Sequence, residues 1–251
     1  MKKLLYFILT LLIIALLITG IVGSFLYINR VSILSNYLSQ KMSTEVSIDK
    51  INVESGKITI EKVKIANPSG YTLSTALEVE TIIFKAPFSQ YFKRHIVLDE
   101  VSLQKIYIGI EFKNKALTEG NWTVLISNLD TNFTTTKPKE EHKVKKNFRT
   151  SRTVFIKKLL FLETYVDLML YDDKTPRKLS PIEKIEIDNV SSEEGIPTEE
   201  ITEVIVHKLM EQITSLKGIT NMILKVPGKA VKTVIAPFSI FFGGSKKSNS
   251  D

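Results

Sequence analysis

The sequence predicts an α+β protein in which one N-terminal transmembrane helix precedes a curled, bulged and mostly antiparallel β-sheet. Three observations carry this prediction. A long run without charged residues opens the chain, short alternating stretches between turn residues fill most of it, and an amphipathic helical pattern follows them. Short capping helices and a C-terminal helical segment complete the expected architecture.

The amino-acid composition excludes several classes of site. Of the 251 residues, 43% are hydrophobic and 24% are charged, which is ordinary for a globular chain. The chain has no cysteine, so disulfides, thiolate catalysis and zinc–thiolate sites are excluded. The formal net charge of +7 fits an anionic membrane surface as well as it fits nucleic acid.

Residues 1–30 are expected to form the membrane anchor. No charged residue interrupts Leu4–Ile28, and as a helix this run spans roughly 37 Å, more than the bilayer core of about 30 Å. Lys2 and Lys3 precede the run, which places the N-terminus in the cytoplasm and the remaining chain outside it. A cleaved signal peptide is the alternative, but the run is longer than a signal core and ends without an Ala-x-Ala site.

Residues 31–130 are expected to hold the first half of the sheet. Val31–Met42 carries an apolar helical stripe and is expected to cap the first strands, the membrane surface being the alternative. Glu45–Val53 and Ile58–Ile65 are expected strands, and the apolar alternation of the second one skips a position at Glu61-Lys62. A β-bulge at that pair would keep both halves of the strand facing one way. Asn67-Pro68-Ser69-Gly70 ends the strand, and a return strand follows.

One pattern occurs four times, as a charged pair between apolar residues. The segments are Ile58–Ile65, Ile96–Leu103, Val154–Phe161 and, more loosely, Pro181–Asp188. We interpret them as one structural unit used repeatedly, a bulged strand and then a return strand, although amphipathic sheets also produce such strings by chance.

An aromatic turn, two strands and a helix are expected next. Phe88, Tyr91 and Phe92 precede Lys93-Arg94-His95. We favour a turn whose aromatic side chains cover the end of the core, and a nucleic-acid or membrane-surface contact is the alternative. Strands at Ile96–Leu103 and Ile106–Phe112 and a helix at 121–129 follow. This helix is expected to cover apolar surface at one end of the sheet.

The rest of the chain divides into three parts. Residues 131–152 are rich in Thr and Lys and are expected to form a flexible basic loop. Residues 153–218 are expected to continue the sheet and to end in a helix capped by Thr198 and terminated by Gly218. Residues 219–251 form a basic and apolar segment that packs against the sheet or enters a membrane interface.

The sequence contains no recognisable catalytic motif. Its histidines lack metal-binding spacing, and it has no P-loop, G-x-S-x-G or G-x-G-x-x-G. The acidic pairs Asp99-Glu100, Asp172-Asp173 and Glu193-Glu194 are expected in solvated bulges and turns, because adjacent carboxylates on a strand point to opposite faces. We therefore expect no enzyme activity, no metal and no cofactor.

A series of segments resembles the AsmA-like proteins of Gram-negative envelopes, which are related to bridge-like lipid-transfer proteins. The series runs from the N-terminal hydrophobic segment through VSIDKINVESGKITIEKVKIANPSGY, ALEVETIIFK and VLDEVSLQKIYIGIEF to GNWTVLISNL, and the resemblance extends from Lys2 to about Leu216. The residues that carry it are expected to be structural: Gly56, Asn67, Pro68, Gly70, Tyr71, Asn121 and Trp122.

The resemblance implies an inner-membrane protein with a taco-shaped sheet in the periplasm, where large members carry phospholipid along an apolar groove. For this short chain we expect non-enzymatic binding or transfer of phospholipid in support of outer-membrane homeostasis, and no nucleic-acid partner. A membrane-anchored scaffold that binds an envelope protein through a sheet edge is the alternative. The residues expected on the apolar concave face, as groove or as closed core, are Ile58, Ile60, Val63, Ile65, Val79, Ile108 and Ile110.

Overall fold

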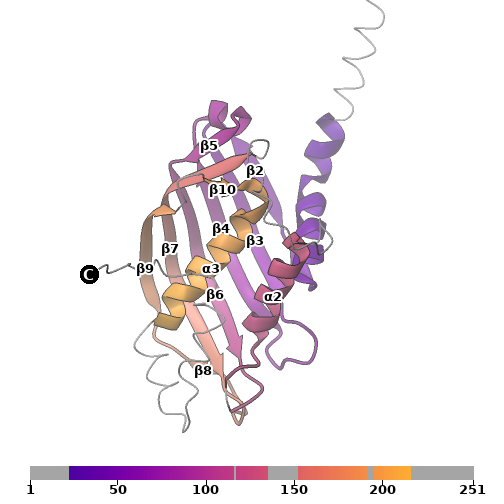
Figure 1. Ribbon diagram of the computed structural model, residues 1–251, viewed down its shortest axis with the longest axis vertical. Helices are drawn as coiled ribbons and strands as arrows, with labels where there is room; N and C mark the ends of the chain where they lie inside the picture. The colour runs from indigo at the N-terminus through magenta and orange to yellow at the C-terminus, as the bar shows by residue number, and fades with distance from the viewer. Residues whose placement is uncertain (1–22, 116, 135–151, 191–194, 216–251) are drawn as a thin grey trace, which may run out of the picture.

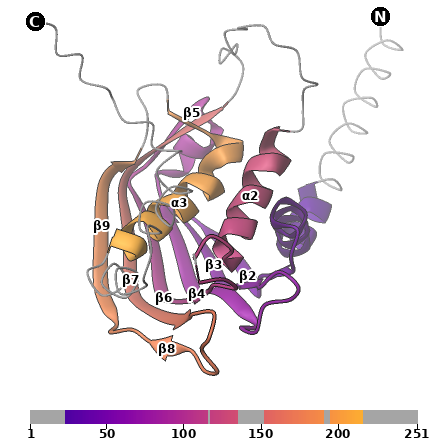
Figure 2. The same cartoon turned by 60° about the horizontal axis from the view of Figure 1, so that its bottom comes forward.

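A ten-stranded, mostly antiparallel sheet curls into a trough whose concave side holds two helices (Figures 1 and 2). The computed structural model describes residues 23–115, 117–134, 152–190 and 195–215. The predicted α+β class and the curled sheet are therefore confirmed. Most of the predicted anchor, most of the basic loop and the C-terminal segment 219–251 lie outside the described residues.

The strands follow a simple order across the sheet. They are β1 (Val46–Ser47), β2 (Lys50–Glu54), β3 (Lys57–Ala66), β4 (Thr75–Lys85), β5 (His95–Leu98), β6 (Glu100–Glu111), β7 (Thr153–Met169), β8 (Arg177–Lys178), β9 (Ile182–Val190) and β10 (Ile196–Pro197). The sheet order is β1-β3-β4-β6-β7-β10, with β2 paired to β3, and with β5, β8 and β9 paired to β7. Only β5 and β6 run parallel to β7, because α2 forms the crossover between β6 and β7.

The helices are η1 (Phe88–Phe92), α2 (Asn121–Thr134), η2 (Thr198–Glu200), α3 (Ile201–Ser215) and an N-terminal helix described over residues 23–42. α2 and α3 lie side by side across the concave face (Figure 2). On α2 the buried apolar residues are those that the helical period predicts: Trp122, Leu125, Ile126 and Leu129. The helix thus covers the concave face itself, which is a larger role than the expected cover at one end.

The N-terminal helix packs along the β1–β2 edge of the sheet. Val31, Leu34 and Leu38 pack against the core and Met42 is fully buried, which confirms the predicted stripe and the capping role. The helix is continuous from residue 23 and does not begin at residue 31. No helix in the described part of the chain is both long and apolar enough to cross a membrane.

A break in side-chain phase crosses the whole sheet at one level. In β3, Ile60 and Val63 are both buried although they are three positions apart, and Lys62 between them has a φ of 52°. The paired strands break at the same level, where Lys105 has a φ of 52° and Glu163 a φ of 54°. On one side of this break lie Ile51, Ile60, Ile82, Leu103, Phe161 and Ile185, and on the other Val63, Val79, Ile106, Thr164 and Ile182.

The predicted bulge at Glu61-Lys62 is therefore wrong in one respect. It restores the apolar face as expected, but β3 gains no residue relative to its neighbours. The β3–β4 register continues through the pair and shifts only between Ile65 and Ala66. Because every strand carries the same extra residue, the pairing survives the break.

A second phase break lies nearer to β5. Leu98 pairs with Ile156, and Val101 with Leu159, so both strands again hold buried residues three positions apart. All four repeated charged pairs lie at a phase break. Glu61-Lys62 and Glu183-Lys184 lie at the first break, and Asp99-Glu100 and Lys157-Lys158 lie at the second. The predicted return strand is present after two of the repeated segments: β4 pairs antiparallel with Ile58–Ile65, and β9 pairs antiparallel with Val154–Phe161. Ile96–Leu103 is followed instead by β7, which runs parallel to it.

Several predicted boundaries are wrong. The phase breaks resemble strand ends in the sequence, so a strand boundary was expected between Leu103 and Ile106, where β6 is continuous. Conversely, Ile96–Leu103 is divided at Asp99, and Glu45–Val53 is divided into β1 and β2. α2 extends to Thr134, into the expected loop.

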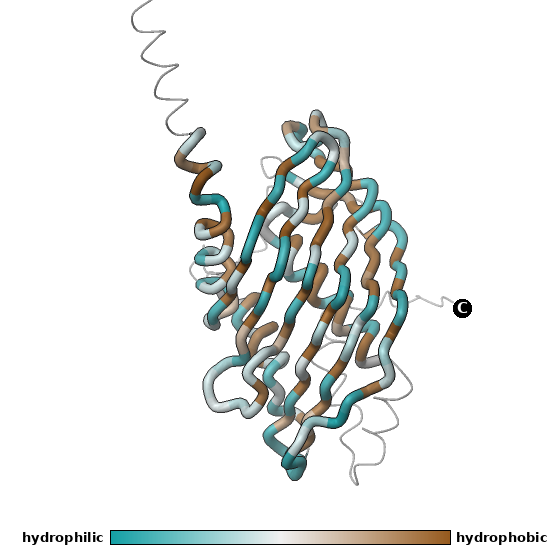
Figure 3. Tube along the Cα trace, turned by 180° about the vertical axis from the view of Figure 1, so that it is seen from behind, coloured by the Kyte–Doolittle hydropathy of each residue, from teal (hydrophilic) through white to brown (hydrophobic). Residues whose placement is uncertain are grey.

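The strand faces differ clearly in polarity. Seen from the convex side, apolar and polar residues alternate along each strand (Figure 3). The apolar set faces the trough and forms one hydrophobic cluster with α2, α3 and the N-terminal helix. The core therefore lies between the sheet and its helices.

Candidate functional site

The predicted concave-face residues lie together in the core. Val79 and Ile108 have no exposed surface, Ile60, Val63, Ile65 and Ile110 are at most 9% exposed, and Ile58 is half-buried against the same cluster. Strand pairing brings them side by side, since Val63 pairs with Val79, and Leu77 lies between Ile65 and Ile108. In this part of the trough the apolar face is a closed core beneath the helices.

The concave face is less closed at its other side, where β9 forms the sheet edge. Ile182, Ile185 and Ile187 of β9 are half-buried, and so are Ile201, Val204 and Ile205 of α3. A cleft of about 400 Å³ separates the two elements. Its apolar lining consists of Ile187, Val190, Ile196, Pro197 and Val204, and Asp188, Asn189, Gly195, Glu200 and Lys208 complete it.

No feature of the sequence predicts this cleft directly. It arises because α3 runs across the trough from β10, and β10 pairs with the start of β7 at Val154. The Thr198 hydroxyl fixes this corner by donating to the Arg152 carbonyl oxygen (2.8 Å). The expected role of Thr198 as a helix cap is thus wrong, since no side chain caps the start of η2.

The residues that carry the family resemblance form a polar junction at one end of the sheet. Asn121 at the start of α2 is fully buried and uses both ends of its amide. Its Oδ1 accepts from the Glu111 backbone N–H (2.9 Å), and its Nδ2 donates to Asn67 Oδ1 (2.7 Å) and to the Gly109 carbonyl oxygen (2.8 Å). Trp122 Nε1 donates to the same carbonyl (2.9 Å). The junction ties α2 to β6 and to the loop after β3.

The remaining members of this set shape the loop that follows β3. Asn67 Nδ2 donates to the Leu73 carbonyl oxygen (2.6 Å), and Pro68 lies in the loop between β3 and β4. Gly70 has a φ of 86°, which only glycine adopts without strain. The Tyr71 ring lies under Lys113 Nζ at 4.1 Å, and burial, followed by Glu111 and Glu119, raises the Tyr71 pKa. Gly56, with a φ of 81°, serves the turn between β2 and β3. These contacts and backbone angles shape the loop after β3 and the turn before this strand.

The sequence missed two members of the junction. The buried Glu111 carboxylate accepts from the backbone N–H groups of Thr72 (2.8 and 2.9 Å) and Leu73 (2.8 Å). A Cβ on Gly109 would lie 2.4 Å from the Thr75 carbonyl oxygen, so the position accepts only glycine. Neither residue type is unusual on a strand, and so no sequence signal marked them.

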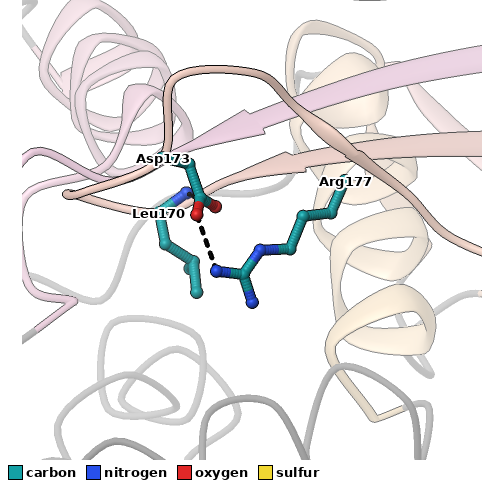
Figure 4. Close-up of polar contacts among 3 residues, drawn as sticks. All are labelled: Leu170, Asp173 and Arg177. Atoms are coloured by element: carbon teal, nitrogen blue, oxygen red, sulfur yellow. Dashed lines mark hydrogen bonds and ion pairs between the residues drawn. The ribbon is translucent and has the colours of Figure 1, made fainter.

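The acidic pairs are structural where the structure describes them. Asp173 closes the turn after β7 by accepting from the Leu170 N–H (3.0 Å) and from Arg177 Nη2 (2.6 Å), as Figure 4 shows. The Arg177 hydrogen bond is the main reason that the Asp173 pKa lies below its ordinary value. Asp99 pairs with Lys157 (2.7 Å) and Glu100 with Lys85 (2.8 Å). Glu193-Glu194 lies outside the described residues.

Metal chemistry finds no support in the described ranges. Within them, no group of three or more His, Asp or Glu side chains is placed to hold a metal ion. The arrangement that remains is a cleft lined by apolar and polar residues, a form typical of small-ligand sites.

The two edges of the sheet differ. Along β1 and β2, side chains of the N-terminal helix form hydrogen bonds with the backbone of the sheet edge. Arg30 Nε donates to the Ile51 carbonyl oxygen (2.9 Å) and Ser35 Oγ donates to the Val46 carbonyl oxygen. The Val46 N–H donates to Ser39 Oγ (2.9 Å). The opposite edge is β9, which pairs only with β7 among the described strands. Its exposed side chains are mostly charged, as is common on sheet edges that avoid nonspecific pairing.

Comparison with protein-family models, with curated proteins and with solved structures finds no match for this chain.

Proposed function

We propose that this protein is a membrane-anchored, non-enzymatic phospholipid-binding protein of the cell envelope, of the type that its motifs resemble. In this proposal residues 1–30 span the inner membrane and the curled sheet stands in the periplasm. The observation that supports lipid binding is the cleft between β9 and α3, where the apolar concave face opens.

The cleft suits part of a lipid rather than a row of lipids. Its volume of about 400 Å³ lies in the range of sites that bind small ligands. An acyl chain resists transfer to water by about 0.8 kcal/mol per CH₂, so even partial shielding of one chain is favourable. Among the charged lining residues, Asp188, Glu200 and Lys208 offer polar contacts to a headgroup, and Lys208 is also paired with Glu211 (3.1 Å).

The closed part of the trough sets a limit on this function. Ile108 and Val79 are inaccessible beneath the helices, so lipid would contact them only if α2 moved away. We therefore assign binding to the β9–α3 side and a core role to the seven residues first expected in the groove. Because most of the trough is closed, we propose that the protein binds lipid locally or passes it over a short distance, and does not transport it along the full trough.

The described start of the N-terminal helix supports the anchor. Phe25, Leu26, Tyr27 and Ile28 are 51–74% exposed although all four are large and apolar or aromatic. An exposed set of this kind, next to an uncharged run in the sequence, suits a helix that enters a bilayer.

The test is photocrosslinking in the full chain, in cells whose phospholipids carry ³²P. A photoreactive benzoylphenylalanine replaces Ile187 in the cleft, and the control carries it at Tyr165 on the convex side of β7, where the side chain is 47% exposed. We expect radioactive lipid to attach at position 187 and not at position 165. In the same strain, Val204→Trp should fill the cleft and reduce the adduct. Equal labelling at both positions, or none at 187 in a folded chain, would refute lipid binding in the cleft.

The scaffold function is the second candidate, and it is favoured by the β9 edge, which pairs with no strand but β7 in the described part of the chain. A partner strand could pair with β9, whereas the opposite edge is covered by the N-terminal helix. The same photoreactive residue at the exposed Glu183 separates the two functions. A protein adduct at 183 without lipid at 187 would support the scaffold instead.

A further inference from the structure

Two aromatic side chains project from the end of the sheet where β4 and β5 are joined. Phe88 is 50% exposed and Phe92 is 74% exposed. Their rings meet edge to face, with 5.0 Å between the ring centroids. Only Tyr91 covers the core, with its hydroxyl directed to the Phe84 carbonyl oxygen (3.4 Å). The interpretation of this turn as a cover for the core is therefore wrong for Phe88 and Phe92.

The turn is held firmly although its tip is exposed. The Arg152 guanidinium donates to the carbonyl oxygens of Tyr91 and Lys93. Directly after the turn, the Thr153 N–H donates to the Arg94 carbonyl oxygen (3.0 Å), and His95 Nδ1 lies 2.8 Å from Thr153 Oγ1. The start of β7 thus fixes the turn, and the two phenylalanines are presented in place before any partner arrives.

The charge around the turn is positive. Lys93 and Arg94 are exposed, and within the described part of the chain neither forms an ion pair. Two acidic residues at this end of the sheet are already paired, Glu54 with Lys57 (3.3 Å) and Glu100 with Lys85 (2.8 Å). Exposed aromatic rings beside unpaired cations match the interface of an anionic bilayer, where apolar rings enter the headgroup region and cations meet lipid phosphates.

The N-terminal helix reaches the same end of the sheet (Figure 1). Arg30 bonds β2 at Ile51, and residue 23 lies about 10 Å further along the helix axis. From Ile51, β2 runs about 10 Å in the same direction to its end at Glu54, where the turn that contains Gly56 begins. The Gly56 carbonyl oxygen accepts from the Ala86 N–H (3.1 Å), just before η1. The exposed apolar start of the helix and the aromatic turn are therefore at one level.

We propose that η1 with Lys93 and Arg94 is a second membrane contact, which rests on the surface of the anionic bilayer that the N-terminal segment spans. The inference depends on the anchor in the proposed function but not on lipid binding in the cleft. With two contacts at one end, the trough stands upright on the membrane and its β8 end points away from it. A single helical anchor would leave the domain free to tilt.

The test uses the absence of cysteine from the chain. The full chain with Ser89→Cys, an exposed position in the turn, is labelled with the environment-sensitive fluorophore NBD and reconstituted in vesicles of phosphatidylcholine and phosphatidylglycerol. The control is Tyr171→Cys, which is 53% exposed and follows β7 at its far end, about 50 Å along the strand from the turn. We expect blue-shifted emission and quenching by lipids spin-labelled near the headgroup at position 89, and neither at position 171.

Two further variants assign the effect. In the Ser89→Cys background, Phe88→Ser with Phe92→Ser should abolish the blue shift. Lys93→Glu with Arg94→Glu should reduce quenching in these vesicles to the level found in phosphatidylcholine alone. Equal quenching at 89 and 171, or none at 89 in protein that floats with the vesicles, would overturn the contact and leave the anchor intact. Protein that does not float with the vesicles would refute the anchor, and the proposed contact with it.

Discussion

Replacing the fully buried Asn121 by alanine should destabilise the fold strongly. Its side chain makes three hydrogen bonds at the junction of α2, β6 and the loop after β3. Without it, the buried Glu111 N–H loses its partner, which costs about 1–3 kcal/mol, and Asn67 Oδ1 loses one bond, worth about 1 kcal/mol. The Gly109 carbonyl oxygen keeps its bond from Trp122. With the small cavity included, we expect a loss of about 3–5 kcal/mol.

The assay is urea unfolding of the full chain, followed by tryptophan fluorescence. Trp122 is the only tryptophan and lies in the junction itself, so it reports the loss where it occurs. With a urea dependence of about 2 kcal/mol per M, the midpoint should fall by about 1.5–2.5 M. Asn128→Ala is the matched control, because that side chain makes one bond, to the Met42 carbonyl oxygen (2.9 Å), and should cost about 1 kcal/mol. An Asn121→Ala loss no larger than the control's would refute the account of the junction.

Three further outcomes follow from positions in the sheet. Gly109→Ala should destabilise the chain by more than about 2 kcal/mol in the same assay, because the new Cβ meets the Thr75 carbonyl oxygen at 2.4 Å; an unchanged midpoint would contradict this. Lys62→Gly should stabilise by up to about 1 kcal/mol by relieving the positive φ, whereas Lys64→Gly, in ordinary strand, should destabilise by about 0.5–1 kcal/mol. Hydrogen bonds from Lys158 of β7 and then from Lys184 lower the pKa of Glu186 to about 2. The contribution of Glu186 to stability is therefore complete above the ordinary pKa of a glutamate and is lost as the pH falls toward 2. Glu186→Gln should remove this part of the acid dependence of unfolding, and identical acid profiles would show that the pairs are not formed in solution.

The strand pattern was largely predictable, and its main error is instructive. Side-chain alternation locates β3, β4 and β9 well, and the charged pairs correctly signal a change of phase. The sequence of one strand cannot show that its neighbours change phase at the same level, because that depends on registers set across the sheet. For this reason a local bulge was expected at Lys62 and a chain reversal near Lys105, where the structure has one continuous break.

The open cleft could not be predicted, because it depends on how far two helices cover the trough. The helical periods of α2 and α3 identify their apolar faces. The face of α2 is buried, whereas that of α3 is buried at Leu209 and Ile213 and only half-buried at Ile201, Val204 and Ile205. The distance between α3 and β9 is set instead by β10 and by the Thr198 bond to Arg152, which are contacts remote in sequence. The exposure of Phe92 was missed for the same reason, since a turn sequence does not reveal which rings the strand ends can shelter.

The shared phase break has a consequence for which strands can join the sheet. A strand that adds to β9 with plain two-residue alternation would match its apolar side chains on one side of Glu183-Lys184 and present the wrong face on the other. Such a strand would gain only half of a side-chain match, whereas one with its own phase break at the same level would gain all of it. The β9 edge, which has no second partner among the described strands, therefore selects incoming strands by the position of their phase break as well as by charge. It resists amyloid-like growth from ordinary amphipathic segments.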